Sequence, residues 1–225
     1  MKLKLCNLFL FLFLYLSGSA HAYTLEPSVT VLSMPVDAGG ATLVLRNPRD
    51  TALPVIFEVA ERTINEDGSE LATPSDDRFI VFPPQVVVQP GQAQSIRIQW
   101  AGGALDQSKS FTLYASEQPL KIEQPTHSGV KTLFRIGASI HVTAEQFSPK
   151  VVVSDHEVLE DGTSVTLSNG GDEFVYIDDL SLRLDKINLS GFQLAKAAGR
   201  TLLPPGGKRT FTIPELRAQP LLQEK

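Results

Sequence analysis

The sequence has almost no cysteine, which excludes one common way of stabilising an exported protein. The only cysteine among the 225 residues is Cys6. It lies in an N-terminal segment where Lys2 and Lys4 precede the apolar run Leu8–Leu16. Together with the small residues at the ends of Ala20–Ala22, this arrangement is typical of a cleavable secretory signal. A mature chain without this segment contains no cysteine and must be stabilised by its core instead of by disulfides.

Long apolar runs are also missing. The run Leu8–Leu16 spans nine residues, whereas a membrane-spanning helix needs about 20. We therefore expect residues 1–22 to be a signal peptide, cleaved between Ala22 and Tyr23, and not a membrane anchor. No membrane insertion is expected after this cleavage. The remaining 203 residues are enough for two domains of about 100 residues each.

A basic surface and a clustered catalytic motif are absent as well. Without Lys2 and Lys4, 18 basic residues remain against 25 acidic ones, which gives a net charge near −7 and argues against a nucleic-acid partner. The three histidines of the mature chain, His127, His141 and His156, have no second histidine or cysteine at metal-ligand spacing. There is no G-x-S-x-G motif and no phosphate-binding glycine loop. The sequence thus predicts no enzyme, metal or cofactor.

What the chain does contain is β-structure. Short runs of strand-forming residues alternate with turns rich in Gly, Pro, Asn and Asp. Pro83 and Pro84 interrupt one run, because proline cannot occupy a central strand, and Pro90 and Gly91 form a turn before the next. Seven such runs favour an immunoglobulin-like sandwich: Ser28–Val36, Ala41–Asn47, Leu53–Arg62, Phe79–Val88, Gln92–Trp100, Ser110–Glu117 and Val130–Val142.

Further runs of the same kind follow. They are Val151–Val153, Ser164–Asn169, Phe174–Leu182, Thr201–Leu203 and Lys208–Ile213. No window after the signal has convincing helical periodicity, since Gln193–Ala198 is too short. We therefore predict an all-β chain with two immunoglobulin-like β-sandwich domains in tandem. The first spans residues 23–143, the hinge residues 144–150, and the second, which is short, residues 151–225.

The segment Phe79–Trp100 resembles the corresponding region of PapD-like pilus chaperones. In that family a double proline is followed by a hydrophobic stretch, a Pro-Gly turn and a strand that ends Ile/Val-Arg-Ile/Leu. Here Pro83-Pro84 precedes Val86–Val88, the Pro90-Gly91 turn and Ile96-Arg97-Ile98. Ala41–Asn47 and Leu203–Phe211 are similar to two further family segments. The resemblance covers nearly all of residues 25–213.

This resemblance implies a periplasmic chaperone that consumes no nucleotide. Its partners would be pilus subunits, which lack their own final strand, and an outer-membrane usher that receives them. The chaperone would lend each subunit its seventh strand. Such strand addition gains affinity from main-chain hydrogen bonds and specificity from alternate side chains.

The predicted strand Val130–Val142 has one apolar face, here called the apolar ridge. Its members are Val130, Thr132, Phe134, Ile136, Ala138, Ile140 and Val142. An uncovered apolar edge strand promotes association, so the free protein is a candidate for self-association. The pattern alone leaves open whether the ridge faces its own core or a partner. The resemblance favours donation of Val130, Thr132, Phe134, Ile136 and Ala138, with Ile140 and Val142 packing in the home domain.

One family feature is missing. Many members carry an arginine on the first strand and a lysine on the donated strand, and these two bind the subunit's C-terminal carboxylate. The lysine position falls on His141, and the region Val31–Ser33 contains no basic residue. His141, Arg135 and Lys131 are therefore the candidate carboxylate anchors. In lacking the usual pair, the sequence is similar to the archaic branch of these chaperones.

An exported pilin-like or adhesive β-sandwich protein is the alternative interpretation. A pilin would carry an alternating donor segment directly after its signal peptide and, in many cases, a cysteine pair. Here that segment is short, contains Pro27 and Pro35, and has no cysteine.

Overall fold

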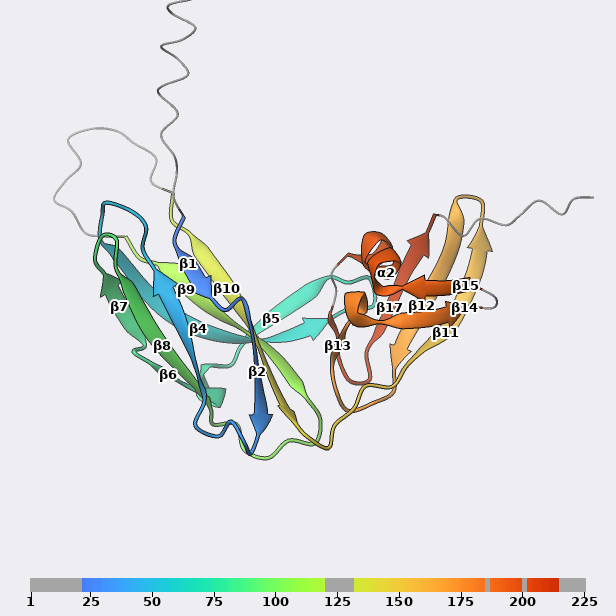
Figure 1. Ribbon diagram of the computed structural model, residues 1–225, viewed down its shortest axis with the longest axis horizontal. Coiled ribbons are helices and arrows are strands. Elements are labelled where there is room, and N and C mark those ends of the chain that lie inside the picture. Colours follow the sequence, from blue (N-terminus) through green and yellow to red (C-terminus); the bar gives the residue numbers. More distant parts are fainter. Residues whose placement is uncertain (1–21, 120–131, 185–186, 200–201, 215–225) are drawn as a thin grey trace, which may run out of the picture.

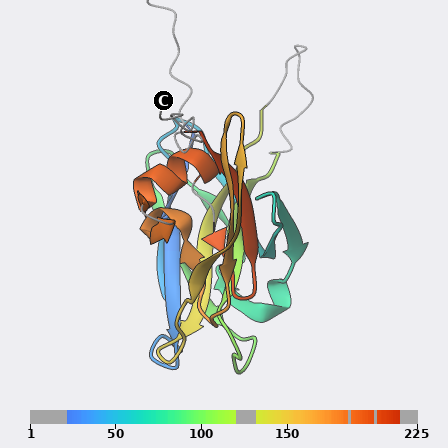
Figure 2. The ribbon, with the colours of Figure 1, turned by 90° about the vertical axis from the view of Figure 1, so that its right-hand side faces the viewer.

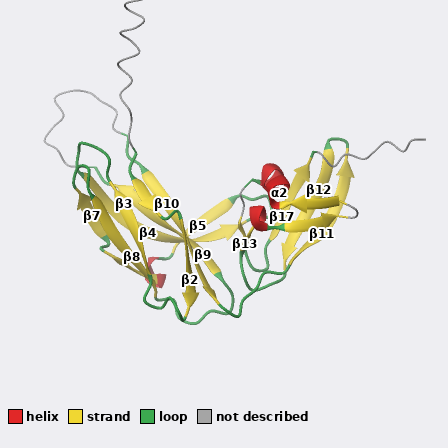
Figure 3. Cartoon of the chain, in the orientation of Figure 1, coloured by secondary structure: helices red, strands yellow, loops and turns green. Residues whose placement is uncertain are grey.

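The computed structural model describes residues 22–119, 132–184, 187–199 and 202–214. Two strand-rich domains meet at an angle, as Figure 1 shows, and helix is confined to short segments (Figure 3). The fold is therefore mostly β, with two immunoglobulin-like domains, as predicted. Within the described ranges, no helix is both long and apolar enough to cross a membrane.

Two sheets form the first domain. The first sheet has four strands, in the order β1 (Thr24–Glu26), β3 (Ala41–Arg46), β8 (Ala93–Trp100) and β6 (Phe79–Phe82). The second sheet has the order β2 (Val29–Met34), β10 (Arg135–Ala144), β9 (Lys109–Glu117), β4 (Leu53–Ile64) and β5 (Glu70–Pro74), and β7 (Gln85–Val88) also pairs with β4. The 3-10 turn η1 (Asp76–Arg78) precedes β6.

Proline residues determine where the chain changes sheet. Pro83 and Pro84 lie between β6, in the first sheet, and β7, in the second. The predicted interruption is thus the point where the chain crosses from one sheet to the other. Pro90 and Gly91 form the turn between β7 and β8, where Gly91 has a φ of 67°, a conformation that glycine adopts without steric cost.

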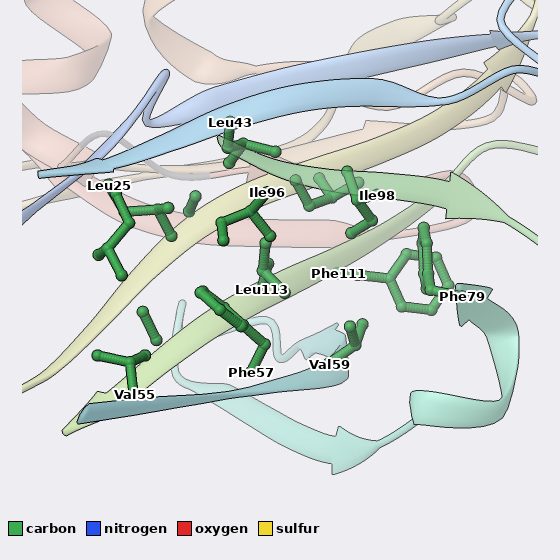
Figure 4. Packing of buried hydrophobic residues seen from close by; sticks show 14 of the residues in the cluster. Leu25, Leu43, Val55, Phe57, Val59, Phe79, Ile96, Ile98, Phe111 and Leu113 are labelled. Atoms are coloured by element: carbon green, nitrogen blue, oxygen red, sulfur yellow. The ribbon is translucent and has the colours of Figure 1, made fainter. Parts of the chain in front are cut away.

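Alternating side chains of both sheets form the core of this domain (Figure 4). Phe79 of the first sheet packs edge-on against Phe111 of the second, with ring centroids 4.9 Å apart. Leu43, Ile96 and Leu113 are fully buried beside them. Burial of this apolar surface is the main stabilising contribution, and the described residues contain no cysteine that could form a disulfide.

The second domain has a smaller, separate core. Its main sheet consists of β11 (Val151–Leu159), β12 (Gly162–Asn169) and β17 (Lys208–Ile213). Two short pairs accompany it: β13 (Val175–Tyr176) with β16 (Leu202–Leu203), and β14 (Ser181–Leu184) with β15 (Ile187–Ser190). The 3-10 turn η2 (Ile177–Asp179) interrupts the predicted strand Phe174–Leu182, which was therefore too long.

The prediction that no helix forms was wrong at one place. Helix α2 (Gly191–Ala198) lies beside the main sheet of the second domain (Figure 2). Ser190 and Gln193 form a reciprocal capping box at its start, which satisfies two otherwise unpaired backbone donors. Leu194 is fully buried in the core. At eight residues the helix is too short for a periodic signal, so its stability depends on this cap and this packing.

The seventh predicted strand was wrong at both ends. β10 begins at Arg135, five residues later than expected, and continues to Ala144. Of the predicted strand residues that precede it, Thr132–Phe134 are described and lie outside the strand. Val130 and Lys131 lie outside the described residues. Residues 145–150 connect β10 to β11.

A buried asparagine performs the same task in each domain. Asn47 follows β3, and its side-chain amide donates to the carbonyl oxygens of Thr51 (2.8 Å) and Val88 (3.0 Å). Asn169 ends β12 and donates to the carbonyl oxygens of Glu173 (2.8 Å), Leu203 and Pro204. Each amide therefore donates to carbonyl groups of the neighbouring loops, and one of these hydrogen bonds in each domain, to Val88 or Leu203, is buried.

Replacing Asn47 should test this role. We expect Asn47→Ala to lower the free energy of unfolding by about 2–3 kcal/mol, because it leaves buried carbonyl groups without a donor. Urea titration followed by tryptophan fluorescence would measure the loss. Asn65→Ala is the matched control, since Asn65 lies in an exposed turn and its removal should cost less than about 0.5 kcal/mol. Equal losses in both variants would contradict the role of Asn47.

Candidate functional site

The first half of β10 is a sheet edge. β10 pairs with β9 from Arg135 onward, but its parallel pairing with β2 starts only at Ser139. Within the described ranges, residues Arg135–Ala138 therefore have a ladder partner on one side only. In Figure 1 this half of the strand lies at the end of the first domain that is remote from the second.

Hydrogen bonds at its two ends show which groups this edge offers. The Glu117 N–H donates to the Phe134 carbonyl (2.9 Å), so even-numbered residues direct their main chain toward β9. The Ser139 N–H donates to the Ser28 carbonyl on the opposite side (2.8 Å). Since the direction alternates along a strand, the N–H and C=O groups of Arg135 and Gly137 point toward the open edge.

The apolar ridge is divided between core and surface. Phe134 is 37% exposed, whereas Ile136 is partly buried against the core of the first domain. Ala138, Ile140 and Val142 are completely buried in that core.

The predicted assignment of Ala138 to the partner is therefore corrected. Its side chain lies inside the home domain, because the core extends one alternating position closer to the start of β10 than expected. Thr132 is exposed, and Val130 lies outside the described residues. The surface part of the ridge in the described chain consequently consists of Thr132, Phe134 and part of Ile136.

Arg135 is a cation on the opposite face of the strand. Its guanidinium lies 3.8 Å from the centroid of the Tyr114 ring and 3.2 Å from a carboxylate oxygen of Glu58. The side chain remains 54% exposed, so an incoming group could reach it. Lys131, the second candidate cation, lies outside the described residues.

His141 contradicts its predicted role as a cation. Its Nδ1 lies 2.9 Å from the Ser110 hydroxyl, and its Nε2 lies 2.9 Å from the Tyr176 hydroxyl. The ring is fully buried and stacks on Phe174, with centroids 4.0 Å apart. Burial, reinforced by the charge of Arg62, lowers the pKa of His141 to about 3. The side chain is therefore neutral and joins the two domains.

Sequence patterns did not reveal Arg62 as part of this junction. Its guanidinium donates to both carboxylate oxygens of Glu70 (3.0 and 2.6 Å) and to the Ser139 hydroxyl of β10 (3.2 Å). Only 11% of the Arg62 side chain is exposed. The single available signal was the alternation of β4, which cannot show that β5 folds back to supply the carboxylate.

The hairpin formed by β4 and β5 also reaches the second domain (Figure 1). At its tip, the Glu66 carbonyl accepts from the Thr210 N–H of β17 (3.0 Å), and the Glu66 carboxylate accepts from the Thr210 hydroxyl (2.7 Å). The two domains therefore meet at His141 and, separately, at this tip.

The described residues contain no group of three side chains that could hold a metal ion. The candidate site consists of the open edge of β10, the exposed part of the apolar ridge and the nearby cation Arg135.

Comparison with known families identifies the family to which the chain belongs. Residues 24–142 match the model of the PapD N-terminal domain, described as a pili and flagellar-assembly chaperone. The chain belongs to the PapD family. Its members are chaperones and not enzymes, in agreement with the prediction. The match favours this class over the alternative of a pilin-like structural protein. No curated protein sequence matches significantly.

Solved structures of PapD-like chaperones share the fold. The complex of CsuC with the tip subunit CsuE, from archaic pili of Acinetobacter baumannii, matches at a TM-score of 0.59 and 16% identity, covering 88% of this chain and 90% of that one. The Salmonella enterica SafA pilin–SafB chaperone complex gives 0.58 and 16%, with coverages of 88% and 86%. The Escherichia coli chaperone DraB gives 0.57 and 18%, with 86% of both chains covered. These similar values do not distinguish the archaic branch.

The buried histidine predicts a pH dependence of stability. Its pKa is about 3 in the folded protein and 6.5 ordinarily. Between these values the unfolded chain binds the extra proton, so the free energy of unfolding should fall as the pH drops below about 6.5. The contribution of His141 should reach about 2 kcal/mol at pH 5.

Urea unfolding at pH 7.5 and pH 5.0 would measure this effect. We expect His141→Gln to remove that part of the pH dependence, whatever its cost at neutral pH. His156→Gln replaces an exposed histidine and should keep the parent's dependence. If His141→Gln kept it too, the histidine would not be the group responsible.

Proposed function

We propose that this protein is a periplasmic chaperone that binds pilus subunits through the first half of β10 and delivers them to an outer-membrane usher. One observation carries this proposal. Residues Arg135–Ala138 have a ladder partner only in β9 within the described chain, and the apolar side chains at this end lie partly at the surface.

The geometry suits the addition of a strand. A subunit strand placed along this edge would find the N–H and C=O groups of Arg135 and Gly137. Phe134 and Ile136 project from the same face as the buried Ala138. In a sandwich that lacks one strand, they would fill the vacant core positions, and main-chain hydrogen bonds would set the register.

The solved complexes support this class of partner. In them, SafB is in complex with a pilin and CsuC with a tip subunit. We extend that class to this chain because of its family membership and its open edge. Export to the periplasm with cleavage near Ala22 belongs to the same proposal. Self-association of the free protein through the uncovered edge also remains part of it.

Arg135 is the proposed anchor for a subunit's C-terminal carboxylate, and Lys131 remains a second candidate. Arg135 is exposed and pairs with Glu58. Exposed ion pairs contribute little to stability, so an incoming carboxylate could replace Glu58 at small cost. A guanidinium can then bind both carboxylate oxygens.

Ile136→Asp should abolish subunit capture. A charge in the subunit's core would lack a partner and would oppose binding by several kcal/mol. The variant would be co-expressed in a bacterial periplasm with pilus subunits from the source genome, and complexes would be counted after affinity purification. Val158→Asp is the control, because Val158 is an exposed apolar residue of the second domain. Thermal unfolding would establish that both variants fold, and normal capture by Ile136→Asp would refute the assignment of the donated strand.

Arg135→Gln should weaken capture by about ten- to 150-fold, because one charge-assisted hydrogen bond contributes about 1.5–3 kcal/mol. Titration of purified chaperone in a competition assay would give the change. Arg78→Gln is the control, because it removes another surface arginine that lies beside a carboxylate, that of Asp77, but is not part of β10. It should have no effect on capture. If the two variants behaved alike, Arg135 would not be the anchor.

A further inference from the structure

The hydrogen bonding of β10 continues one residue beyond its ladder with β9. The last paired residues are Arg135 and Ser116. At the next position, the Phe134 carbonyl accepts from the Glu117 N–H (2.9 Å). The Phe134 N–H, however, donates to the side-chain carboxylate of Glu117 (3.3 Å). A side chain therefore stands in for the main-chain acceptor at the point where the donated strand begins.

Arg49 fixes this carboxylate. The guanidinium donates to both oxygens of Glu117, at 2.8 and 3.2 Å. The Glu117 side chain is only 5% exposed, and that of Arg49 is 17% exposed. The guanidinium also lies 5.3 Å from the Phe134 ring centroid and 5.5 Å from that of Tyr23. A bidentate pair in such a setting has a defined orientation, so Arg49 orients Glu117 toward Phe134.

Tyr23 connects the same point to β9 from the core side. Its side chain is buried, and its hydroxyl lies 2.6 Å from the Ala115 carbonyl and 2.8 Å from the Phe134 carbonyl. The single phenolic proton serves two acceptors, one on β9 and one at the start of β10. Burial, together with the charge of Glu117, raises the pKa of Tyr23 to about 12. The hydroxyl is therefore a donor at every physiological pH.

We propose that Tyr23, Arg49 and Glu117 are positioning residues, here called the strand clamp, that hold the start of β10 in its subunit-binding conformation before a subunit arrives. They come from the segment before β1, the loop after β3 and the end of β9. Because they are largely buried, they act through Phe134 and not by contacting the subunit. The role rests on the proposed function.

An ordered strand edge improves binding by lowering its entropic cost. Fixing the backbone of a residue costs conformational entropy, and a partner must supply whatever ordering the free protein lacks. The strand clamp acts on Phe134, directly before the open groups of Arg135 and Gly137. Loss of the clamp should therefore free the edge without unfolding the domain.

Hydrogen exchange in the free protein tests this positioning without a subunit. We expect Tyr23→Phe to accelerate exchange of the Ile136 amide, which faces β9, by about three- to tenfold. Exchange of the Val142 amide, farther along the same ladder, should stay at the parent rate. Thr166→Val is the matched control, because it removes a hydroxyl that bonds Thr210 in the second domain. Equal acceleration at Ile136 and Val142, or none at Ile136, would overturn the proposal.

Two substitutions of Glu117 should weaken the strand clamp to different degrees. Glu117→Gln retains an oxygen that can accept from the Phe134 N–H, whereas Glu117→Ala does not. Exchange at Ile136 should therefore rise from parent to glutamine to alanine, and reversal of this order would contradict the clamp. If the alanine variant fails to fold, Tyr23→Phe still decides the matter.

Capture of the subunit identified by the Ile136 experiment supplies the functional measurement. Tyr23→Phe should weaken that capture by about three- to tenfold, in line with its effect on exchange. Faster exchange with unchanged capture would overturn the proposal, since positioning would then have no role in binding. If the parent protein captures no subunit, the proposed function fails, while exchange at Ile136 still decides whether the clamp orders the strand.

Discussion

A β-strand places successive side chains on opposite faces. In β10 this alternation continues from the core of the first domain to the surface, so that one face of the strand serves both. From Ala138 onward the even-numbered side chains complete the home core, and at Ile136 and Phe134 the same face reaches the surface. A substitution that shifts the register of β10 would move the buried side chains and the surface side chains of this face together. The stability of the domain and the presentation of the strand edge are therefore tied to one register.

The other face of β10 changes character along its length in a complementary way. Near its start, Arg135 and Gly137 are exposed, whereas His141 near its end is completely buried between the domains. The second domain thus covers the part of the strand that β2 already pairs. The C-terminal half of β10 is therefore held by β2 and the second domain, whereas its N-terminal half has an open edge.

The sequence, together with the family resemblance, anticipated this strand and its division, but assigned Ala138 to the partner although its side chain is buried in the home core. Alternation from Val130 to Val142 revealed the apolar ridge, yet its limits depend on where β2 begins to pair, which a local pattern cannot show. Sequence position alone makes His141 a candidate cation, because it cannot show that Phe174 and Tyr176, more than 30 residues away, pack against the ring. Arg49 lay in a segment that reads only as a turn, so its pairing with Glu117 was invisible. Helix α2 was missed because its packing, and not its periodicity, stabilises it.

The hairpin of β4 and β5 has a mechanical consequence. The second domain is attached near residues 145–150, where the Ser108 N–H also donates to the Asp172 carbonyl (2.8 Å). It is also attached at His141, whose Nε2 lies 2.9 Å from the Tyr176 hydroxyl, and at the hairpin tip, where Glu66 bonds Thr210. Bending of one domain against the other must therefore stretch at least one of these contacts. The hairpin acts as a brace across the angle between the two domains.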